Sequence, residues 1–276
     1  MAAKAEVLES GRATRPAEQQ RATPVSTELS VAQLTKRYAP GSAPVLDAVS
    51  LSVGRGERVA LLGANGSGKS TLLRCCLRLI EPSQGHIRLF NDDVLDLSRA
   101  QLRRLRTRTG FVFQRHNLVG RLSVLSNVLH GALGRARHPG DWFQATTTQT
   151  ARAQALACLR EVGLAGCAAQ RADRLSGGQS QRVAIARTLM QQPRLVFADE
   201  PAASLDPAAG EEVMGLFSRL IAEQGMSLVF SSHDLDHARR YADRIIALRG
   251  GQVVFDEPAS RVDFGGLYEL YQKEAG

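Results

Sequence analysis

The sequence lacks any apolar run that approaches the ~18 residues a membrane-spanning helix requires. It also lacks the pattern of a secretory signal peptide, because charges interrupt residues 4–9 and no apolar segment follows them. Hydrophobic residues make up 43% and charged residues 22% of the 276 positions, values typical of a globular protein. We therefore expect a protein that stays in the cytosol and meets a membrane only through a partner.

Cysteine is scarce, and its spacing argues against two further classes of protein. The four cysteines, Cys75, Cys76, Cys158 and Cys167, show neither metal-ligand spacing nor the framework of a disulfide-rich secreted domain. Cys75 and Cys76 are neighbours in a helix-like segment, so their side chains diverge. We interpret all four as reduced packing residues.

Lysine is rare as well, although the chain is basic. The formal net charge is +8, yet lysine occurs only at Lys4, Lys36, Lys69 and Lys273, so arginine supplies most of the positive charge. Residues 97–140 contain nine arginines and no acidic residue. Two interpretations stay open at this point: compositional drift, or attraction to anions such as nucleotide, nucleic acid or lipid headgroups.

Strand-like and helix-like segments alternate on both sides of a long helical stretch. Residues 1–27 lack hydrophobic periodicity and are predicted to form a mobile tail. Strands are predicted at 29–34, 45–53, 58–62, 86–90, 110–114, 195–198, 227–231, 245–248 and 253–255. Helices are predicted at 70–80 and near 123–134, 148–162, 178–191, 207–224 and 234–242. The pattern indicates an α/β domain over 28–257, with a helical subdomain inserted at about 116–190 and an extension over 258–276.

Residues 63–71, which read GANGSGKST, fit the G-x-x-x-x-G-K-[ST] pattern of a phosphate-binding loop. They follow an apolar strand and open a helix, which is the context the pattern requires. Glycines let backbone N–H groups turn inward around phosphate oxygens, and the helix N-terminus adds partial positive charge. Lys69 supplies a charge for the β- and γ-phosphates, and Ser70 supplies an oxygen for Mg²⁺. The residues predicted to bind a nucleoside triphosphate are Gly63, Asn65, Gly66, Ser67, Gly68, Lys69, Ser70 and Thr71.

Two carboxylates stand at the end of the apolar strand 195–198. Asp199 is placed to hold Mg²⁺, directly or through water. Glu200 is placed to polarise an attacking water as a general base. Paired acids after a strand often serve only as a cap or loop feature, but a phosphate-binding loop upstream in the same chain favours the catalytic interpretation.

A second glycine-containing turn precedes the helix predicted to begin near Ser180. Ser176, Gly177, Gly178 and Gln179 form a potential anion-binding nest at that helix N-terminus. One nucleotide has no need of two such nests in one chain. The arrangement makes sense if this nest closes on the nucleotide of a second subunit.

Taken in order, these motifs resemble those of the ABC ATPase family over residues 28–256. The matching motifs are the phosphate-binding loop (Walker A), the signature at 175–179, the strand with two carboxylates (Walker B, 195–200), the D-loop at 204–206 and His233. The resemblance implies an α/β P-loop NTPase fold: a RecA-like core sheet, an antiparallel β subdomain and an inserted α-helical subdomain. It also implies a head-to-tail dimer that sandwiches ATP between one copy's phosphate-binding loop and the other copy's signature.

The resemblance assigns roles to further residues. Gln114, after the apolar strand 111–113, is implied near Mg²⁺ and the attacking water, and His233 is implied at the γ-phosphate. With Glu200 these form the implied catalytic group, while Ser70, Gln114 and Asp199 are the implied Mg²⁺ ligands. Asp206 of the D-loop is implied at the nucleotide. Tyr38 resembles the aromatic residue that stacks on adenine, a contact that contributes about 1–3 kcal/mol.

Within the family, residues 113–131, 170–173, 198–207 and 241–246 are similar to the phosphonate importer ATPases. Ser180 departs from that subgroup, which often has glutamine there, and residues 232–234 follow the generic importer form. The likeness implies an importer for phosphonates or a related small oxyanion.

The likeness also implies partners and a location. The partners are transmembrane permease subunits, which the arginine-rich stretch beside Gln114 would face, and indirectly a periplasmic binding protein. The location is peripheral, at the cytoplasmic face of the bacterial inner membrane. No nucleic-acid partner is expected, because no aromatic interleaving or nucleic-acid module accompanies the arginines. One alternative stays open: a soluble ABC-type accessory ATPase of a phosphonate-breakdown or nucleic-acid complex.

Overall fold

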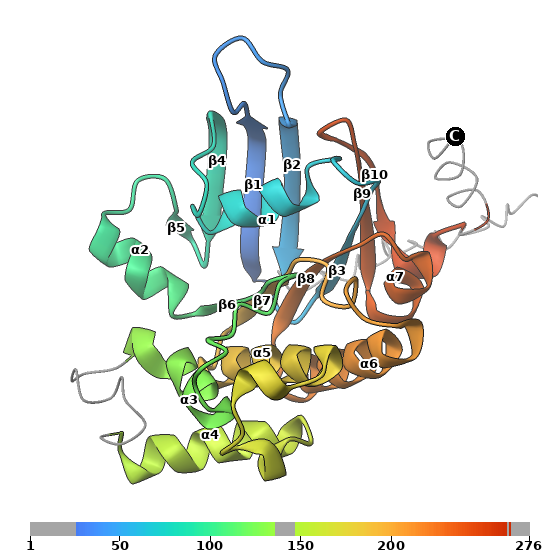
Figure 1. Cartoon of the computed structure of the whole chain (residues 1–276). Coiled ribbons are helices and arrows are strands. Elements are labelled where there is room, and N and C mark those ends of the chain that lie inside the picture. Colours follow the sequence, from blue (N-terminus) through green and yellow to red (C-terminus); the bar gives the residue numbers. More distant parts are fainter. Residues whose placement is uncertain (1–25, 136–146, 264, 266–276) are drawn as a thin grey trace, which may run out of the picture.

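The computed structural model describes residues 26–135, 147–263 and 265. Within them, two β-sheets lie on one side of the molecule and a layer of helices on the other (Figure 1). No helix of the described part is long and apolar enough to cross a membrane. The arrangement is the α/β fold with a core sheet, an antiparallel β subdomain and a helical subdomain that the sequence predicts.

The larger sheet has six strands in the order β10-β9-β3-β8-β7-β6. Its members are β3 (Arg58–Leu62), β6 (Thr109–Val112), β7 (Leu195–Ala198), β8 (Ser227–Ser232), β9 (Arg244–Arg249) and β10 (Gln252–Pro258). Neighbouring strands from β9 to β6 run parallel, whereas β10 pairs antiparallel with β9. Every residue of β7 and β8 is buried, as expected for parallel strands covered on both faces. The carboxyl ends of β3, β6, β7 and β8 therefore meet at one edge.

The smaller sheet is antiparallel, with strand order β2-β1-β4-β5. Its members are β1 (Thr27–Lys36), β2 (Leu46–Gly54), β4 (Gln84–Leu89) and β5 (Asp92–Asp93). Side chains of β2 alternate between buried and exposed, the pattern of a sheet with one face against a core. That core also contains Leu72, Leu73, Cys75 and Cys76 of α1 (Lys69–Cys76) and reaches Phe197 and Val229 of the larger sheet. Helix α1 is therefore held between the two sheets.

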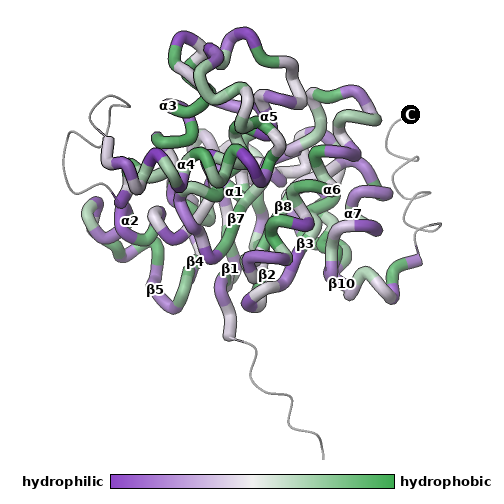
Figure 2. The backbone as a smooth tube through the Cα atoms, turned by 90° about the horizontal axis from the view of Figure 1, so that it is seen from below, coloured by the Kyte–Doolittle hydropathy of each residue, from purple (hydrophilic) through white to green (hydrophobic). Residues whose placement is uncertain are grey.

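A second core joins the larger sheet to the helical layer. The helices are α2 (Arg99–Arg106), α3 (Val124–Leu129), α4 (Gln149–Glu161), α5 (Gly177–Met190), α6 (Pro207–Glu223) and α7 (Leu235–Tyr241), with short 3-10 turns η1 (His130–Arg135), η3 (Ala165–Cys167), η4 (Ala172–Arg174) and η5 (Ala259–Arg261). Hydrophobic and hydrophilic stretches alternate along α6 (Figure 2), as expected for a helix with one face on a core.

Three local differences from the sequence predictions have physical reasons. Helix α1 ends at Cys76 rather than residue 80, because Arg78 adopts a left-handed φ of 51°. Helix α2 lies where the sequence predicts no element; Ser98 and Gln101 form a capping box at its start, a signal that the sequence does contain. Helix α5 begins at Gly177 rather than near Ser180, because the Ser176 side chain accepts a hydrogen bond from the Gln179 backbone.

The ends of the chain lie largely outside the described residues. Of the predicted mobile tail, residues 1–25 are not described, and β1 begins at Thr27. Of the predicted extension, residues 264 and 266–276 are not described, while β10 runs to Pro258. All four cysteines are free thiols, as predicted, and burial raises the pKa of Cys75 to about 11.

Candidate functional site

The phosphate-binding loop connects β3 to the N-terminus of α1, and its backbone geometry admits only glycine at key positions. Gly63 and Gly68 adopt φ values of 153° and 105°. A Cβ at Gly63 would lie 2.5 Å from the Leu248 carbonyl oxygen, and a Cβ at Gly68 would lie 2.7 Å from the Val45 carbonyl oxygen. The glycines therefore let the loop pass close to the neighbouring backbone.

Lys69 is the buried cation of this loop, with 5% of its surface exposed. Its Nζ donates hydrogen bonds to the carbonyl oxygens of Gly63 (2.6 Å) and Ala64 (3.1 Å), and it lies 3.8 Å from Glu200 Oε1. Burial lowers the pKa of Lys69, and the nearby carboxylates of Glu200 and Asp199 act in the opposite direction. A buried amine with spare donors, beside the unpartnered buried hydroxyl of Ser67, suits a polyanionic ligand such as a triphosphate.

Asp199 directly follows β7 and is almost fully buried, at 1% exposure. Its Oδ1 accepts hydrogen bonds from the hydroxyls of Ser70 (2.6 Å) and Ser231 (3.1 Å). Its Oδ2 lies 3.3 Å from Arg74 Nη2. The phosphate-binding loop and the first predicted carboxylate are thus brought into direct contact at the carboxyl edge of the sheet, where open α/β sheets bind ligands.

Glu200 follows Asp199 with a left-handed φ of 47°, a strained conformation for a residue with a Cβ. Its backbone N–H donates to Ser231 Oγ (2.9 Å), which supports that conformation. Its Oε2 accepts a hydrogen bond of 3.3 Å from Gln114 Nε2. The turn directs the Glu200 side chain into a cavity of about 640 Å³. The residues lining this cavity are Val45, Asn65, Gly66, Ser67, Gly68, Lys69, Ser70, Thr71, Gln114, Glu200, Ala203 and His233.

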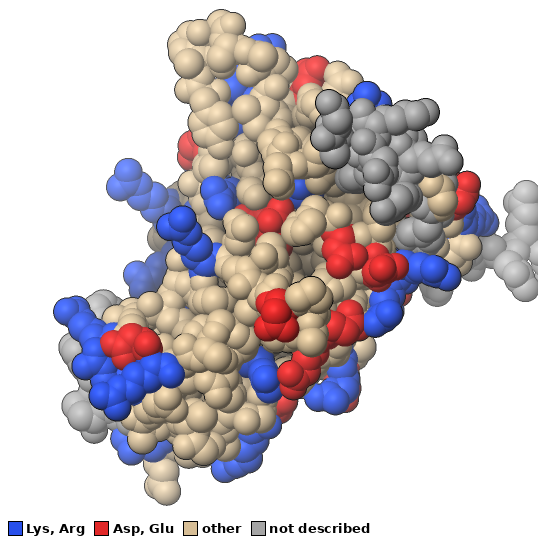
Figure 3. Space-filling model, turned by 45° about the vertical axis from the view of Figure 1, so that its right-hand side comes forward, with Lys and Arg blue, Asp and Glu red and all other residues tan. Residues whose placement is uncertain are grey.

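His233 follows β8 and also lines a second cavity, of about 370 Å³. This cavity lies between residues 200–207 and α7, and Asp206, Glu211, Asp234 and Asp236 are among its lining residues. Acidic side chains gather across the face that carries α6 and α7, with arginines beside them (Figure 3). Asp206 is thus separate from the larger cavity. Its side chain caps α6, accepting a hydrogen bond of 3.0 Å from the Ala209 backbone.

Tyr38 lies at the margin of the site rather than in its lining. Its hydroxyl is 3.2 Å from Thr71 Oγ1, and 60% of its surface is exposed. Lys36 Nζ lies 5.1 Å from the centre of its ring. An exposed aromatic ring beside the end of the phosphate-binding loop can stack on a planar group.

The four signature residues stand at the N-terminus of α5 but do not line the larger cavity of their own chain. Ser176 caps α5, and Gln179 completes a capping box with it. A Cβ at Gly177 would lie 3.2 Å from Leu205 Cδ2, so the glycine allows the D-loop to pack against the start of α5. Ser176, Gly177, Gly178 and Gln179 are absent from the lining of both cavities.

Arg74 and Ser231 belong to the site although no motif names them. Arg74 lies one helical turn after Ser70 and so shares its face of α1. Ser231 stands near the end of the apolar strand that precedes His233. Both residue types are common in such positions, so the sequence carries only a weak signal for either.

Together, a glycine-rich loop at a helix N-terminus, a buried lysine and two carboxylates at the sheet edge define a P-loop nucleoside triphosphatase.

Comparison with known proteins identifies the family. The sequence model of the ABC transporter family matches residues 46–203. A protein of Mycolicibacterium smegmatis, called the phosphate-import ATP-binding protein PhnC, is 50% identical over 240 residues, covering 87% of this chain and 90% of that protein. The phosphonates import ATP-binding protein PhnC of Alcaligenes faecalis is 46% identical over 246 residues, covering 89% of this chain and 88% of that protein.

Solved structures agree with this family assignment. An ATP-binding cassette solved as a dimer in a post-hydrolysis state with ADP and Pi superposes with a TM-score of 0.74 at 35% identity, covering 84% of this chain and 98% of that one. The chain belongs to the ABC transporter family and is an ATPase of that family.

Proposed function

We propose that this chain binds and hydrolyses ATP to energise an importer of phosphonates or a related small oxyanion. The observation that carries the ATPase part is the 2.6 Å hydrogen bond from Ser70 to Asp199, since it unites both halves of a phosphate and metal site. The cargo part is supported by the names of the relatives, which divide between phosphonates and phosphate. Both are tetrahedral oxyanions of phosphorus, so the relatives agree on the chemical class.

The roles we assign follow from the positions of the side chains. The phosphate-binding loop, residues 63–71, would bind the triphosphate, with Lys69 near the β- and γ-phosphates. Glu200 would orient and polarise the attacking water as a general base, assisted by its partner Gln114. His233, which lines the same cavity, would contact the γ-phosphate.

We assign Ser70, Asp199 and Gln114 as the residues that would hold Mg²⁺. Among the described residues no cluster of three or more histidine, cysteine, aspartate or glutamate side chains is arranged as a metal site. One carboxylate, one hydroxyl and one amide still fit this ion, which takes few protein ligands and shares its shell with phosphates and water. The bound ion would neutralise charge on the β- and γ-phosphates.

We further propose that two copies assemble head to tail around two ATP molecules. The signature residues Ser176, Gly177, Gly178 and Gln179 do not line either of the two cavities described above, so they are available to the nucleotide of a second copy. Asp206, in the D-loop beside this nest, would approach the same nucleotide. Tyr38 would stack on adenine at the rim of the loop.

The domain assignment, partners and location follow from this function. Residues 28–257 would form the ATPase domain, with the helical subdomain at about 116–190, between the tail and the extension. Transmembrane permease subunits would use the free energy of ATP hydrolysis, and a periplasmic binding protein would select the cargo. The protein would then act at the cytoplasmic face of the bacterial inner membrane, without a nucleic-acid partner.

The experiment that tests the cargo is uptake by a reconstituted importer. The chain, its permease and its binding protein are assembled in proteoliposomes with ATP inside, and uptake of methylphosphonate, phosphate and an amino acid is compared. Uptake of methylphosphonate or phosphate supports the proposal, whereas uptake of the amino acid alone contradicts the cargo. A genome without a neighbouring permease gene would instead favour a soluble accessory ATPase.

A further inference from the structure

Arg187, near the end of α5, is a half-buried cation that pairs with no carboxylate among the described residues. Its guanidinium instead donates two hydrogen bonds to backbone carbonyl oxygens, from Nη1 to Asn117 (2.7 Å) and from Nη2 to His116 (2.9 Å). Burial lowers the pKa of Arg187. The planar guanidinium lets one side chain bind two neighbouring carbonyl groups at once, which a single-headed side chain such as lysine cannot do with the same geometry.

The two carbonyls belong to the segment that connects β6 to α3, residues 113–123. This segment forms neither helix nor strand from 113 to 119, and Asn117 adopts a left-handed φ of 49°. A second side chain holds its far end: Asn127 of α3 accepts from the Val119 backbone N–H (2.8 Å) and donates to the Val119 carbonyl (3.2 Å). Side chains of the helical subdomain therefore hold the backbone at residues 116–119, whereas Gly120 and Leu122 accept hydrogen bonds from the backbone N–H groups of Asp173 and Ala172.

The same segment carries Gln114, which reaches into the catalytic cavity and donates to Glu200 Oε2. Only one residue separates Gln114 from His116, the first residue that Arg187 holds. A contact at His116 therefore limits how far the Gln114 backbone can shift. A chain of contacts therefore connects α5, through Arg187 and the backbone of residues 114–117, to the side chains of Gln114 and Glu200.

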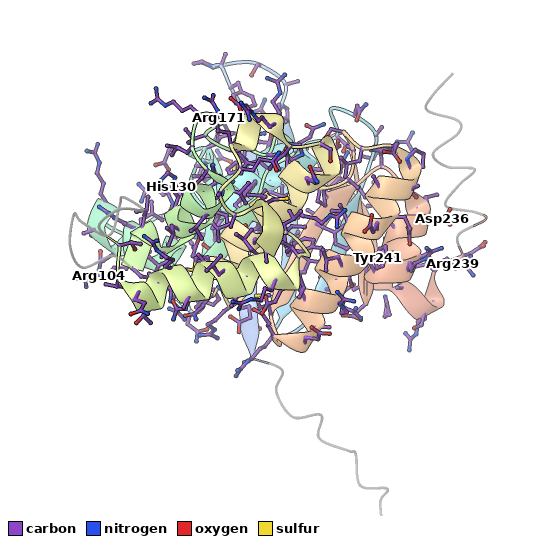
Figure 4. The ribbon with its side chains drawn as sticks, turned by 60° about the horizontal axis from the view of Figure 1, so that its bottom comes forward. Arg104, His130, Arg171, Asp236, Arg239 and Tyr241 are labelled. Atoms are coloured by element: carbon purple, nitrogen blue, oxygen red, sulfur yellow. The ribbon has the colours of Figure 1, made fainter. Side chains whose placement is uncertain are left out.

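Helix α5 is itself fixed against the helical layer where Arg187 lies. A Cβ at Gly131 of η1 would overlap the Arg187 carbonyl oxygen, so η1 and α5 are in close backbone contact there. His130, which begins η1, is seen on the helical side of the molecule in Figure 4. The opposite end of α5 carries Ser176 and the signature nest. Arg187 thus joins the helix that bears the signature to the segment that bears Gln114.

We propose that Arg187 is a positioning residue for hydrolysis, which sets the place of Gln114 relative to Glu200 and ties it to helix α5. This inference rests on the proposed roles of Gln114 and Glu200. It predicts that loss of Arg187 slows the chemical step while the phosphate-binding loop still binds ATP. A purely structural role predicts lower stability without a selective effect on kcat.

The test is a double-mutant cycle on the full-length chain, with kcat and KM for ATP measured at each corner. Arg187→Met removes both donors and keeps much of the side-chain length. We expect kcat to fall about 10- to 100-fold, the range for a misplaced catalytic group, with KM changed less than about threefold. In a Gln114→Ala background, we expect Arg187→Met to lower kcat by no more than about twofold, because coupled residues are not additive.

Arg182→Met is the matched control, since it makes the same change on the same helix. Arg182 pairs with Glu212 of α6 at 3.4 Å rather than with residues 116–117, so kcat should stay within about twofold. If Arg187→Met does not yield folded protein, Arg187→Lys is compared instead in the wild type and in Gln114→Ala. Lysine keeps the positive charge but lacks the two parallel guanidinium donors.

Equal falls in kcat with and without Gln114, or a rise in KM alone, would overturn the positioning role. If either result is obtained and the wild-type chain hydrolyses ATP, only the positioning role is contradicted, and the proposed function is unaffected. A wild-type chain that does not hydrolyse ATP would overturn both.

Discussion

The hydroxyl of Ser70 donates a 2.6 Å hydrogen bond to Oδ1 of Asp199, 129 positions further along the chain. Ser70 is in the first turn of α1, and Asp199 directly follows β7. The bond aligns a helix N-terminus, which favours anions, with a carboxylate suited to a divalent cation. On the roles proposed above, this bond would join the triphosphate site to the metal site.

Replacing Lys69 tests the phosphate-binding loop. Lys69→Ala removes a charge-assisted contact of roughly 1.5–3 kcal/mol, so ATP affinity should fall about 10- to 150-fold and hydrolysis should be lost. Equilibrium binding of a fluorescent ATP analogue and a phosphate-release assay measure the two effects. Arg219→Ala, in an exposed pair with Glu223 on α6, is the control and should retain both activities. Wild-type turnover by Lys69→Ala would refute the assignment of the loop.

Replacing Glu200 separates the general base from ATP binding. Glu200→Gln keeps the size of the side chain and its contact with Gln114, but it removes the carboxylate, so hydrolysis should fall about 10²- to 10⁴-fold. ATP should still bind, and the stalled protein should elute as a dimer in size-exclusion chromatography with ATP and Mg²⁺.

The dimer of Glu200→Gln in turn tests the signature nest. Adding Ser176→Arg places bulk and charge in the nest and should abolish the dimer while circular dichroism remains that of the folded chain. A monomeric Glu200→Gln at saturating ATP, or a dimer unaffected by Ser176→Arg, would contradict the head-to-tail arrangement.

Ser231 should support catalysis from outside the motifs. Ser231→Ala removes a donor to Asp199 and an acceptor for the Glu200 N–H, so kcat should fall about tenfold and the free energy of unfolding by roughly 1–3 kcal/mol. Ser227→Ala is the matched control, because Ser227 is equally buried on the same strand and bonds to Gly54 and Gly56 instead. The control should lose stability and keep its kcat. If the two variants have equal kcat values, the proposed contribution of Ser231 to catalysis is contradicted.

Acidification should weaken the fold through two histidines near Arg187. Burial, with the charge of Arg187 second, lowers the pKa values of His116 and His130 below 6.5. Below pH 6.5 the unfolded chain therefore binds more protons than the folded chain, so the free energy of unfolding falls as the pH drops towards the folded pKa values. Above pH 6.5 these histidines add no pH dependence.

Urea denaturation at pH 7.5 and pH 5.5 measures this effect. The double variant His116→Asn, His130→Asn should show a smaller difference between the two pH values than the wild type. An unchanged difference would assign the pH dependence to other groups.

The local parts of the site could be predicted from the sequence because local rules determine them. Gly63, Gly68 and Lys69 act within one loop, where spacing alone sets the direction of N–H groups and charge. Asp199 and Glu200 were predictable because an apolar strand before them places them at a sheet edge. Helix α2 was missed because its arginines obscure the buried Leu102 and Leu105, although the capping box at Ser98 indicates its start.

The contacts between distant residues could not be predicted in the same way. Arg74 and Ser231 join Asp199, and Arg187 holds the backbone beside Gln114. Each contact joins elements that are neighbours only because of the sheet order and the packing of α5. Serine and arginine are also common on protein surfaces, so their identity alone does not mark a role.

The sequence by itself determined the family, the order of the motifs and the chemistry of the nucleotide site, because these depend on short-range spacing and residue type. Only the tertiary structure decided which side chains complete that site and how the helical subdomain is tied to it. Strand order β10-β9-β3-β8-β7-β6 brings Ser70, Asp199 and Ser231 to one edge, and the burial of Asp199 and Ser231 requires that their polar atoms find partners there.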